Sequence, residues 1–258
     1  MNLLAYKSIG KGRTCVFLHG FLESSNMWRN LPLIDLEVHC LFIDLPGHGN
    51  SKFSETESPE GGMQQMAIKV IEVIESQGIE DFDILGHSMG GYVAQEVKRL
   101  KSQCGKVVLL NSNFWTDSPT KVIDRKRVAT LVQKTKTFFL KNAIPGLFAN
   151  PDKFKVEISE LIAEASEIDS SAIAYASLAM ASRRDFSKLT PLEDLFVIHG
   201  VADRLVSSEQ FKRLGILDGH FFELKYAGHM SHMESPNEVI QVLKVILKNF
   251  TSNSNSIV

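Results

Sequence analysis

The stretch Phe82-Asp83-Ile84-Leu85-Gly86-His87-Ser88-Met89-Gly90-Gly91 decides the fold of this chain. Its first four residues predict a buried strand, because a short apolar run that ends at a glycine suits a strand covered on both faces. Residues 93–100 repeat apolar side chains at helical spacing, so a helix follows the turn at once. A strand, a glycine-rich turn and a helix in succession present the central serine on a sharp corner.

Four more short apolar runs, each ended by turn residues, predict further strands. They are Cys15–Leu18, Cys40–Ile43, Val107–Leu110 and Leu195–Ile198. Helical periods lie between and after them, for example at residues 66–74 and 239–247. Strands that alternate with helices predict an α/β protein with a parallel sheet and helices on both faces. Because ligands of such sheets bind at the carboxyl ends of the strands, we expect the functional site there.

Residues 114–185 interrupt the alternation, because they show helical periods and no convincing strand. We therefore expect a helical cap at 114–185, an α/β core made of 1–113 and 186–250, and a flexible tail at 251–258. Seven basic residues between Lys121 and Lys141 indicate a solvated face or, alternatively, the steering of an anionic substrate. The apolar residues interleaved with them are expected to face the core or a pocket; they include Val128, Val132, Phe138, Phe139 and Leu140.

Ser88 needs a base and a group that orients the base, because a serine hydroxyl alone is a poor nucleophile. His229 precedes the last helix and follows the apolar stretch 221–224, which places it on a loop at the edge of the sheet. Asp203 follows the predicted strand 195–198, again at a carboxyl end. The order Ser88, Asp203, His229 is the order of one known hydrolase fold.

Two other residues compete for these roles. His232 lies three residues after His229 and is an alternative base. Asp44 is a rival acid, but the segment 45–49 that follows it is typical of a turn in which the aspartate accepts backbone N–H bonds.

A serine nucleophile also needs N–H donors for the oxyanion of its tetrahedral intermediate. Met89, directly after Ser88, supplies one backbone N–H. Phe21 is the candidate for the second, because it lies in His19-Gly20-Phe21-Leu22 at the end of a predicted strand.

Taken together, these segments resemble the α/β-hydrolase superfamily over nearly the whole chain. The resemblance rests on residues 19–22, 44–51, 86–91, 199–203 and 228–236, in that order. It implies an eight-stranded, mostly parallel sheet with a helical cap, a Ser-His-Asp triad, no cofactor and no metal, and it implies Phe21 and Met89 as oxyanion donors.

The front of the chain is also similar to the menaquinone-pathway enzymes that eliminate pyruvate. Those enzymes usually carry an arginine soon after the nucleophile, whereas Tyr92 stands in that place here. The leading hypothesis is therefore a serine hydrolase that cleaves a small or medium carboxylic ester. Carbon–carbon bond hydrolysis or pyruvate elimination, and a ligand-binding receptor with residual hydrolysis, remain the alternatives. Four residues are expected to contact substrate: Phe21, His87, Trp115 and Met230.

The composition of the chain narrows the classes of binding partner that we expect. Of 258 residues, 44% are hydrophobic and 22% charged, and the net charge of −2 gives no field that would hold nucleic acid or an anionic membrane. The longest apolar runs are far shorter than the 20 or so residues of a membrane span. Three scattered cysteines and no secretory pattern at Met1–Lys7 favour the cytoplasm. We expect a small-molecule substrate as the partner and make no prediction of the oligomeric state.

Overall fold

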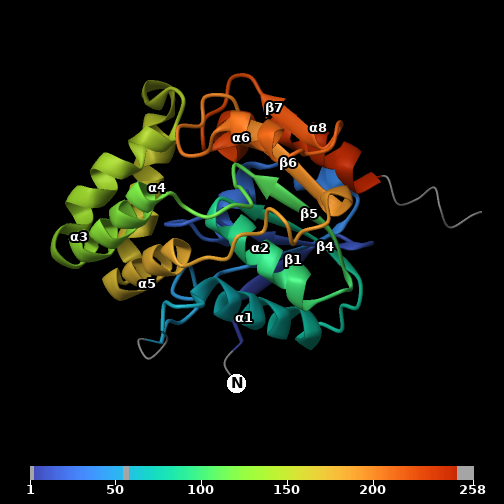
Figure 1. Cartoon of the computed structure of the whole chain (residues 1–258), viewed down its shortest axis with the longest axis horizontal. Helices are drawn as coiled ribbons and strands as arrows, with labels where there is room; N and C mark the ends of the chain where they lie inside the picture. The colour runs from blue at the N-terminus through green and yellow to red at the C-terminus, as the bar shows by residue number, and fades with distance from the viewer. Residues whose placement is uncertain (1–2, 55–57, 249–258) are drawn as a thin grey trace, which may run out of the picture.

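The computed structural model describes residues 3–54 and 58–248, which form a central sheet with helices on both faces (Figure 1). The strands are β1 (Tyr6–Ile9), β2 (Thr14–Leu18), β3 (His39–Ile43), β4 (Phe82–His87), β5 (Cys104–Leu110), β6 (Leu195–Gly200) and β7 (Phe221–Leu224). Their order is β1-β3-β2-β4-β5-β6-β7. Only β1 is antiparallel to its neighbour, so the sheet is mostly parallel, as the alternation of strands and helices predicts.

The described residues form seven strands, whereas the resemblance implied eight. β1 is an edge strand with all four residues exposed, so it has no apolar run by which the sequence could reveal it. Only Leu3, Leu4 and Ala5 precede β1 among the described residues, which is too few for another strand and a turn. The predicted tail at 251–258 lies outside the described residues.

Alternate side chains of the strands build two cores, one on each face of the sheet. Val16, Ile84 and Val107 point to the face covered by α1 (Gly62–Ser76), α2 (Met89–Leu100) and α6 (Ser208–Arg213). Phe17 and Leu85 point to the opposite face. There they meet the 3-10 helices η1 (Ser25–Asn30) and η2 (Leu33–Leu36) and the last helix, α8 (Pro236–Lys248).

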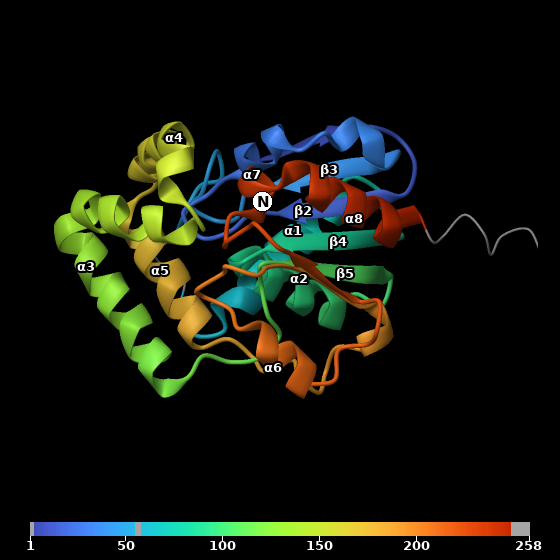
Figure 2. The same ribbon diagram turned by 90° about the horizontal axis from the view of Figure 1, so that it is seen from above.

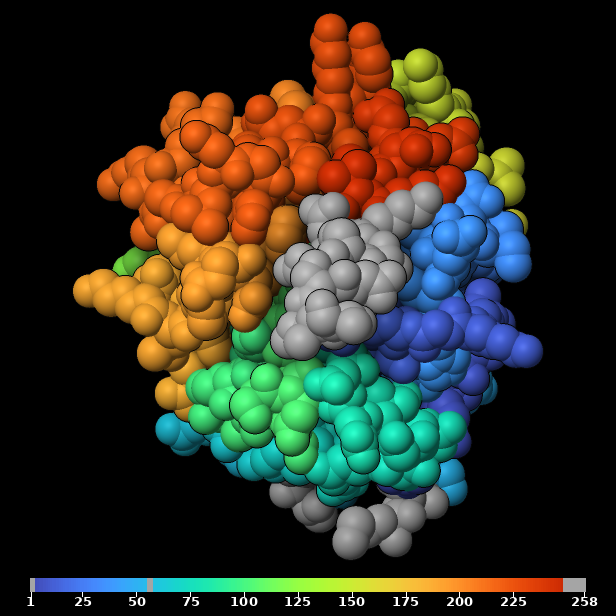
Figure 3. All heavy atoms as spheres, turned by 90° about the vertical axis from the view of Figure 1, so that its right-hand side faces the viewer, coloured from blue at the N-terminus to red at the C-terminus, as the bar shows by residue number. Residues whose placement is uncertain are grey.

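The last helix holds an early segment of the chain in place. Lys244 of α8 contacts Asp35 of η2, with Nζ 3.1 Å from Oδ2. Figure 3, a view from the end opposite to α3, shows segments of the first 50 residues in blue beside segments beyond residue 200 in orange and red. The two chain ends therefore contribute to one α/β body.

The segment 114–185 contains α3 (Pro119–Ala143), α4 (Lys155–Glu167) and α5 (Ser170–Ala181), with the 3-10 turns η3 (Pro145–Leu147) and η4 (Pro151–Phe154) between them. These helices form a separate layer at one end of the sheet (Figure 2). Their apolar core includes Leu22, from the loop after β2, and Met230, from the loop after β7. The layer therefore packs on loops that leave the carboxyl ends of the strands.

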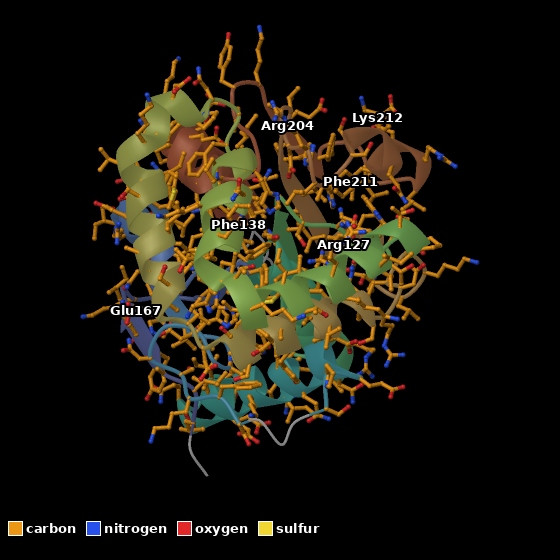
Figure 4. All side chains as sticks on the ribbon, turned by 90° about the vertical axis from the view of Figure 1, so that its left-hand side faces the viewer. Arg127, Phe138, Glu167, Arg204, Phe211 and Lys212 are labelled. Carbon is orange, nitrogen blue, oxygen red and sulfur yellow. The ribbon has the colours of Figure 1, made fainter. Side chains whose placement is uncertain are left out.

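One side chain of α3 does not face inward as expected. Phe138 is 66% exposed, and Figure 4 shows it on the side of α3 nearest the viewer, on the same helix as Arg127. Three adjacent residues of a helix point 100° apart, so Phe138, Phe139 and Leu140 cannot all face the core. Thr135, with φ −144° and ψ 47°, also interrupts the helix and resets its phase.

Candidate active site

Ser88 lies at the corner between β4 and α2, where the chain turns most sharply. Its backbone angles, φ 48° and ψ −113°, lie in a region that residues with a side chain rarely adopt. The corner is held by hydrogen bonds on both sides, from Ser88 N–H to the Leu110 carbonyl and from Gly91 N–H to the Ser88 carbonyl, each 3.0 Å long. The strained backbone thus has external support and keeps the hydroxyl at the carboxyl end of the sheet.

Glycine is required at position 90 by the close approach of another strand. A Cβ on Gly90 would lie 2.5 Å from the Leu18 carbonyl oxygen and 2.6 Å from that of His19. Both contacts are to backbone, which cannot swing aside. The turn after β4 can therefore pack against the end of β2 only because this residue has no side chain.

The structure brings Ser88, His229 and Asp203 together from three separate loops. Ser88 Oγ lies 2.9 Å from His229 Nε2, and His229 Nδ1 lies 2.8 Å from Asp203 Oδ2. The carboxylate accepts the Nδ1 proton, which leaves Nε2 free to accept the proton of the serine hydroxyl. His229 is 4% exposed. The relay, by which we mean the series Asp203, His229 and Ser88, is therefore largely shielded from water. The carboxylate determines which nitrogen of His229 carries the proton.

Asp203 is kept ionised by its surroundings. Burial by itself would raise the pKa of the Asp203 carboxyl, but the His229 imidazole and several hydrogen bonds lower it well below its usual range. Oδ1 accepts the backbone N–H of Leu205 at 2.8 Å, and Oδ2 accepts Asn111 Nδ2 at 3.1 Å as well as His229. The acid is therefore oriented as well as charged.

Asn111 is a functional residue that sequence reasoning missed. It directly follows β5 and has a φ of 47°, and its amide also donates to the Gly228 carbonyl at 3.0 Å. The Ser231 hydroxyl donates to the Asn111 side-chain oxygen. One side chain thus ties the loop of the acid to the loop of the base. The only sequence signal was a polar residue at the end of an apolar strand.

Phe21 and Met89 carry the two candidate oxyanion donors. Among the described residues, neither backbone N–H has a hydrogen-bond partner. Gly20 O accepts the His19 Nδ1–H at 2.8 Å, and because the carbonyl and N–H of one trans peptide point in opposite directions, the Phe21 N–H points away from His19. His19 Nε2 accepts the Leu45 N–H at 2.8 Å, which fixes the ring.

The rival acid and the alternative base have other roles. Asp44 accepts the N–H groups of Ser25 at 2.7 Å and Asn50 at 2.9 Å, so the prediction of a turn residue is confirmed. His232 is fully buried, with Nε2 3.4 Å from Glu23 Oε1, and no hydrogen bond to Ser88 is seen in the described part of the chain.

Glu23, His87 and His232 form a buried cluster beside the relay. Their ligand-type atoms all lie within 4.8 Å of one another, and they are the group among the described residues that could hold a metal ion. His87 uses both ring nitrogens for other contacts, Nδ1 with Glu23 Oε2 at 2.6 Å and Nε2 with the His229 carbonyl at 2.9 Å. His87 therefore has no ring nitrogen left to bind a metal ion while these two hydrogen bonds are made.

A cavity of about 430 Å³ opens onto Ser88 and His229. Three of the four residues expected to contact substrate, Phe21, His87 and Met230, line it. Most of the remaining wall is apolar and comes from the helical layer and nearby loops; it includes Leu22, Tyr92, Val128, Phe139, Ile144, Leu147, Met180 and Val206.

The expectation that Trp115 contacts substrate is wrong, because this residue does not line the cavity. Its ring packs edge-on against Phe114 and Phe211, with centroids 5.4 Å and 4.9 Å away. Its carbonyl accepts two hydrogen bonds from the Arg183 guanidinium. The tryptophan is therefore a packing residue at the junction of the sheet and the helical layer.

Two of the basic residues of α3, Lys121 and Arg125, reach the cavity. Arg125 Nε donates to Asp117 Oδ2 at 2.8 Å, and Lys121 Nζ donates to the Leu205 carbonyl. Arg127, by contrast, has a side chain that is 72% exposed, as a solvated helix face requires. The basic run of the sequence thus divides between the cavity wall and the outer surface.

Comparison with solved structures agrees with this fold. A solved esterase from Thermogutta terrifontis is 25% identical, with a TM-score of 0.85 over 95% of this chain and 93% of that one. A solved esterase from Exiguobacterium antarcticum superposes with a TM-score of 0.81 over 95% of each chain at 18% identity.

Curated relatives match this chain at comparable identity. A 2-succinyl-6-hydroxy-2,4-cyclohexadiene-1-carboxylate synthase from Enterobacter is 23% identical over 90% of this chain and 91% of its own length. The acetyltransferase component of an acetoin cleaving system from Pseudomonas putida is 26% identical over 93% of this chain, which spans 65% of that relative. Of the larger chloroplastic protein PHYLLO from Arabidopsis thaliana, this chain spans 16%.

None of the helices in residues 3–54 and 58–248 is long and apolar enough to cross a membrane. The family model described as "Alpha/beta hydrolase family" matches residues 15–242, and this includes the strand–serine–helix corner, the loops of Asp203 and His229, and the helical layer. On this match and the fold, the chain belongs to the alpha/beta hydrolase family.

Proposed function

We propose that this protein is a serine hydrolase that cleaves small or medium carboxylic esters through an acyl-enzyme intermediate. The observation that carries the proposal is the continuous relay from Asp203 through His229 to Ser88 Oγ, with contacts of 2.8 Å and 2.9 Å, at the wall of an apolar cavity.

The reaction follows from the positions of these groups. Ser88 Oγ attacks the ester carbonyl while His229 Nε2 takes its proton, and Asp203 stabilises the imidazolium that forms. The N–H groups of Phe21 and Met89 donate to the oxyanion. His229 then gives the proton to the leaving alcohol, and water releases the acid by the same steps in reverse.

The cavity supports the size and polarity of the substrate. A volume of about 430 Å³ is at the lower end of the range for small-molecule pockets. Its wall of aliphatic, methionine and phenylalanine side chains favours an apolar acyl or alcohol group. The helices of 114–185 supply much of this wall, and we infer that they act as a cap that selects the substrate.

Ser88→Ala tests the assignment of the nucleophile. With p-nitrophenyl acetate we expect a pre-steady-state burst of about one equivalent in the wild type and none in the variant, because the acyl-enzyme cannot form. Turnover should fall by at least about a thousandfold. Ser76→Ala, which removes a hydroxyl that bonds within α1, is the matched control. A Ser88→Ala protein with undiminished turnover would refute the proposal.

Pyruvate elimination is the second candidate, since the match to the synthase relative covers 90% of this chain and 91% of the synthase. Tyr92 weakens it: the phenol lines the cavity, and the Arg183 guanidinium over its ring, 4.2 Å from the centroid, is engaged by Asp117. Elimination needs only a base and accumulates no acyl-enzyme, so the burst experiment separates the two reactions. Saturable binding with no product would favour a receptor instead.

A further inference from the structure

Glu23 and His87 form a buried bridge that connects the three loops of the site. His87 is the last residue of β4, directly before Ser88, and Glu23 lies two residues after Phe21. Glu23 Oε2 accepts the Gly20 N–H at 2.9 Å and lies 2.6 Å from His87 Nδ1. On its far side the His87 ring bonds to the His229 carbonyl at 2.9 Å.

The partners of His87 define its protonation. The His229 carbonyl oxygen can only accept, so His87 Nε2 must carry a proton. The pKa of the Glu23 carboxyl is held well below its usual range by the neighbouring imidazole, so Oε2 is an ionised oxygen that only accepts, and Nδ1 of His87 also donates. A ring with two donors is an imidazolium, and the contact of 2.6 Å is a charge-assisted hydrogen bond.

Burial makes each charge dependent on the other. Glu23 is 3% exposed and His87 is 1% exposed, and an unpaired charge at either place would be costly. Burial by itself would raise the pKa of the Glu23 carboxyl, but the imidazole of His87 lowers it well below its usual range. Burial by itself would lower the pKa of His87, but Glu23 raises it above its usual value.

The other titratable groups near His87 come from the loop of the base. The ring centroids of His229 and His232 lie 5.1 Å and 4.9 Å from that of His87. Burial lowers the pKa of His232, which therefore stays neutral and adds no second positive charge. The charge of Asp203 further favours the protonated form of His87.

We propose that Glu23 and His87 are positioning residues for the reaction at Ser88, with His87 held as an imidazolium between the Glu23 carboxylate and the His229 carbonyl. The inference rests on the proposed function. The backbone N–H of His229 donates to the Leu147 carbonyl at 2.8 Å, and the backbone carbonyl of His229 accepts from His87. The peptide groups on both sides of the base are therefore held in place. Glu23 meanwhile holds the Gly20 N–H, one peptide before the donor of Phe21. The bridge thus sets the distance of both the base and the oxyanion donor from the nucleophile.

The charge state can be measured without any substrate. In ¹⁵N-histidine NMR spectra we expect His87 to titrate with a midpoint above 6.5, so that most molecules have both ring nitrogens protonated at pH 6.5. The signal is assigned by its loss in His87→Gln or, if that variant does not fold, through the backbone of residues 86–88. A titration midpoint of His87 at or below 6.5 in the wild type would overturn the inference.

Glu23→Gln tests the positioning role while conserving shape. The glutamine has no charge, so the negative group that holds His87 as an imidazolium is lost and the ring becomes neutral. Because Oε2 alone contacts both the Gly20 N–H and His87 Nδ1, the amide can satisfy only one of these two contacts. We expect the imidazolium signal to vanish, kcat to fall by about tenfold to a hundredfold and KM to change little, because misplaced reacting groups slow the chemical step. Glu238→Gln, at an exposed position of α8, is the matched control and keeps the wild-type spectrum and kcat.

The rate at which a fluorophosphonate labels Ser88 distinguishes a failure of the proposed function from a failure of the positioning role. A wild-type protein that is not labelled would refute the proposed function. Labelling of the wild type with equally fast labelling of Glu23→Gln would refute the positioning role alone. We expect labelling of Glu23→Gln to be slower by about the same factor as kcat, and partial recovery of the rate in Glu23→Asp, which restores the carboxylate.

Discussion

The position of Ser88 is fixed by neighbouring residues that take no part in the proposed reaction. Its unfavourable backbone angles persist because the turn is bonded to β5 and packed against the end of β2. Gly90 matters as much as the serine, since the carbonyl oxygens of β2 and of His19 occupy the space that a side chain would need. The site therefore depends on the absence of one Cβ atom.

Gly90→Ala is expected to lower both stability and activity. Its Cβ would lie 2.5 Å from a backbone oxygen, so the turn must move away from the strand that leads to Phe21. Overpacking of this kind costs about 1–3 kcal/mol, and a displaced turn should reduce kcat by at least about tenfold. Thermal unfolding and p-nitrophenyl acetate hydrolysis measure the two effects.

Gly146→Ala is the control for stability, because no atom lies within 4 Å of its added Cβ. Its unfolding midpoint should equal that of the wild type. Normal melting together with normal kcat in Gly90→Ala would show that the turn tolerates a side chain, contrary to the packing described above.

At the scale of the elements, the sheet and the helical layer supply different parts of the candidate site. The loops after β2, β4, β6 and β7 supply Phe21, Ser88, Asp203 and His229, because carboxyl ends of parallel strands meet at one edge. The helices α3 and α5 supply most of the cavity wall opposite to the nucleophile. On the proposed function, the reacting groups come from the sheet and the groups that select the substrate come from the helices.

Met180→Trp tests this division. Met180 is 1% exposed, lies on α5 and lines the cavity, so a larger side chain there takes up space intended for substrate. We expect kcat/KM for a p-nitrophenyl octanoate to fall at least about tenfold more than for the acetate, since each methylene is worth up to a few kcal/mol in such pockets.

Phe138→Ala, on the exposed side of α3, is the comparison variant and should keep the preference for chain length unchanged. An equal loss for acetate and octanoate in Met180→Trp would mean that the acyl chain lies elsewhere.

At the scale of the whole molecule, the buried pair of Glu23 and His87 links stability to pH. The lowered pKa of Glu23 adds stability that is complete above its ordinary value of 4.5 and is lost as the pH falls through the lowered value. The raised pKa of His87 adds stability that is complete below its ordinary value of 6.5 and is lost as the pH rises through the raised value. Both contributions are complete together between pH 4.5 and 6.5.

Glu23→Ala should therefore be most damaging in that window. Removing one partner of a buried pair costs about 3–5 kcal/mol, and we expect the free-energy difference from the wild type to be largest at pH 5.5 and smaller at pH 3.5 and pH 9. Urea unfolding at the three pH values measures it. A difference that is constant with pH would show that the two side chains are not paired as ions.

The sequence predicted the local part of this architecture well. The parallel strands β2 to β6 were visible because a strand buried on both faces must be apolar throughout, and α1, α2 and α8 because their buried faces repeat at helical spacing. β1 was missed for the opposite reason: an exposed edge strand needs no apolar run.

The site was predictable only in part. Ser88, Asp203 and His229 each carry a signal within a few residues, as side chains at the ends of apolar strands, and the structure brings these three together. Trp115 was misplaced and Glu23 and Asn111 were missed, because their roles depend on partners that lie 64 or more residues away. No local pattern reports such a contact.

By itself, then, the amino-acid sequence determined the buried strands and helices, the parallel sheet and the candidate reacting groups, since each of these depends on side-chain type and short-range spacing. Only the tertiary structure decided which histidine meets the serine, which aromatic side chain lines the cavity and which buried charge is neutralised. Those outcomes are set by packing between segments far apart in the chain, where a shift of about 1 Å separates a hydrogen bond from none.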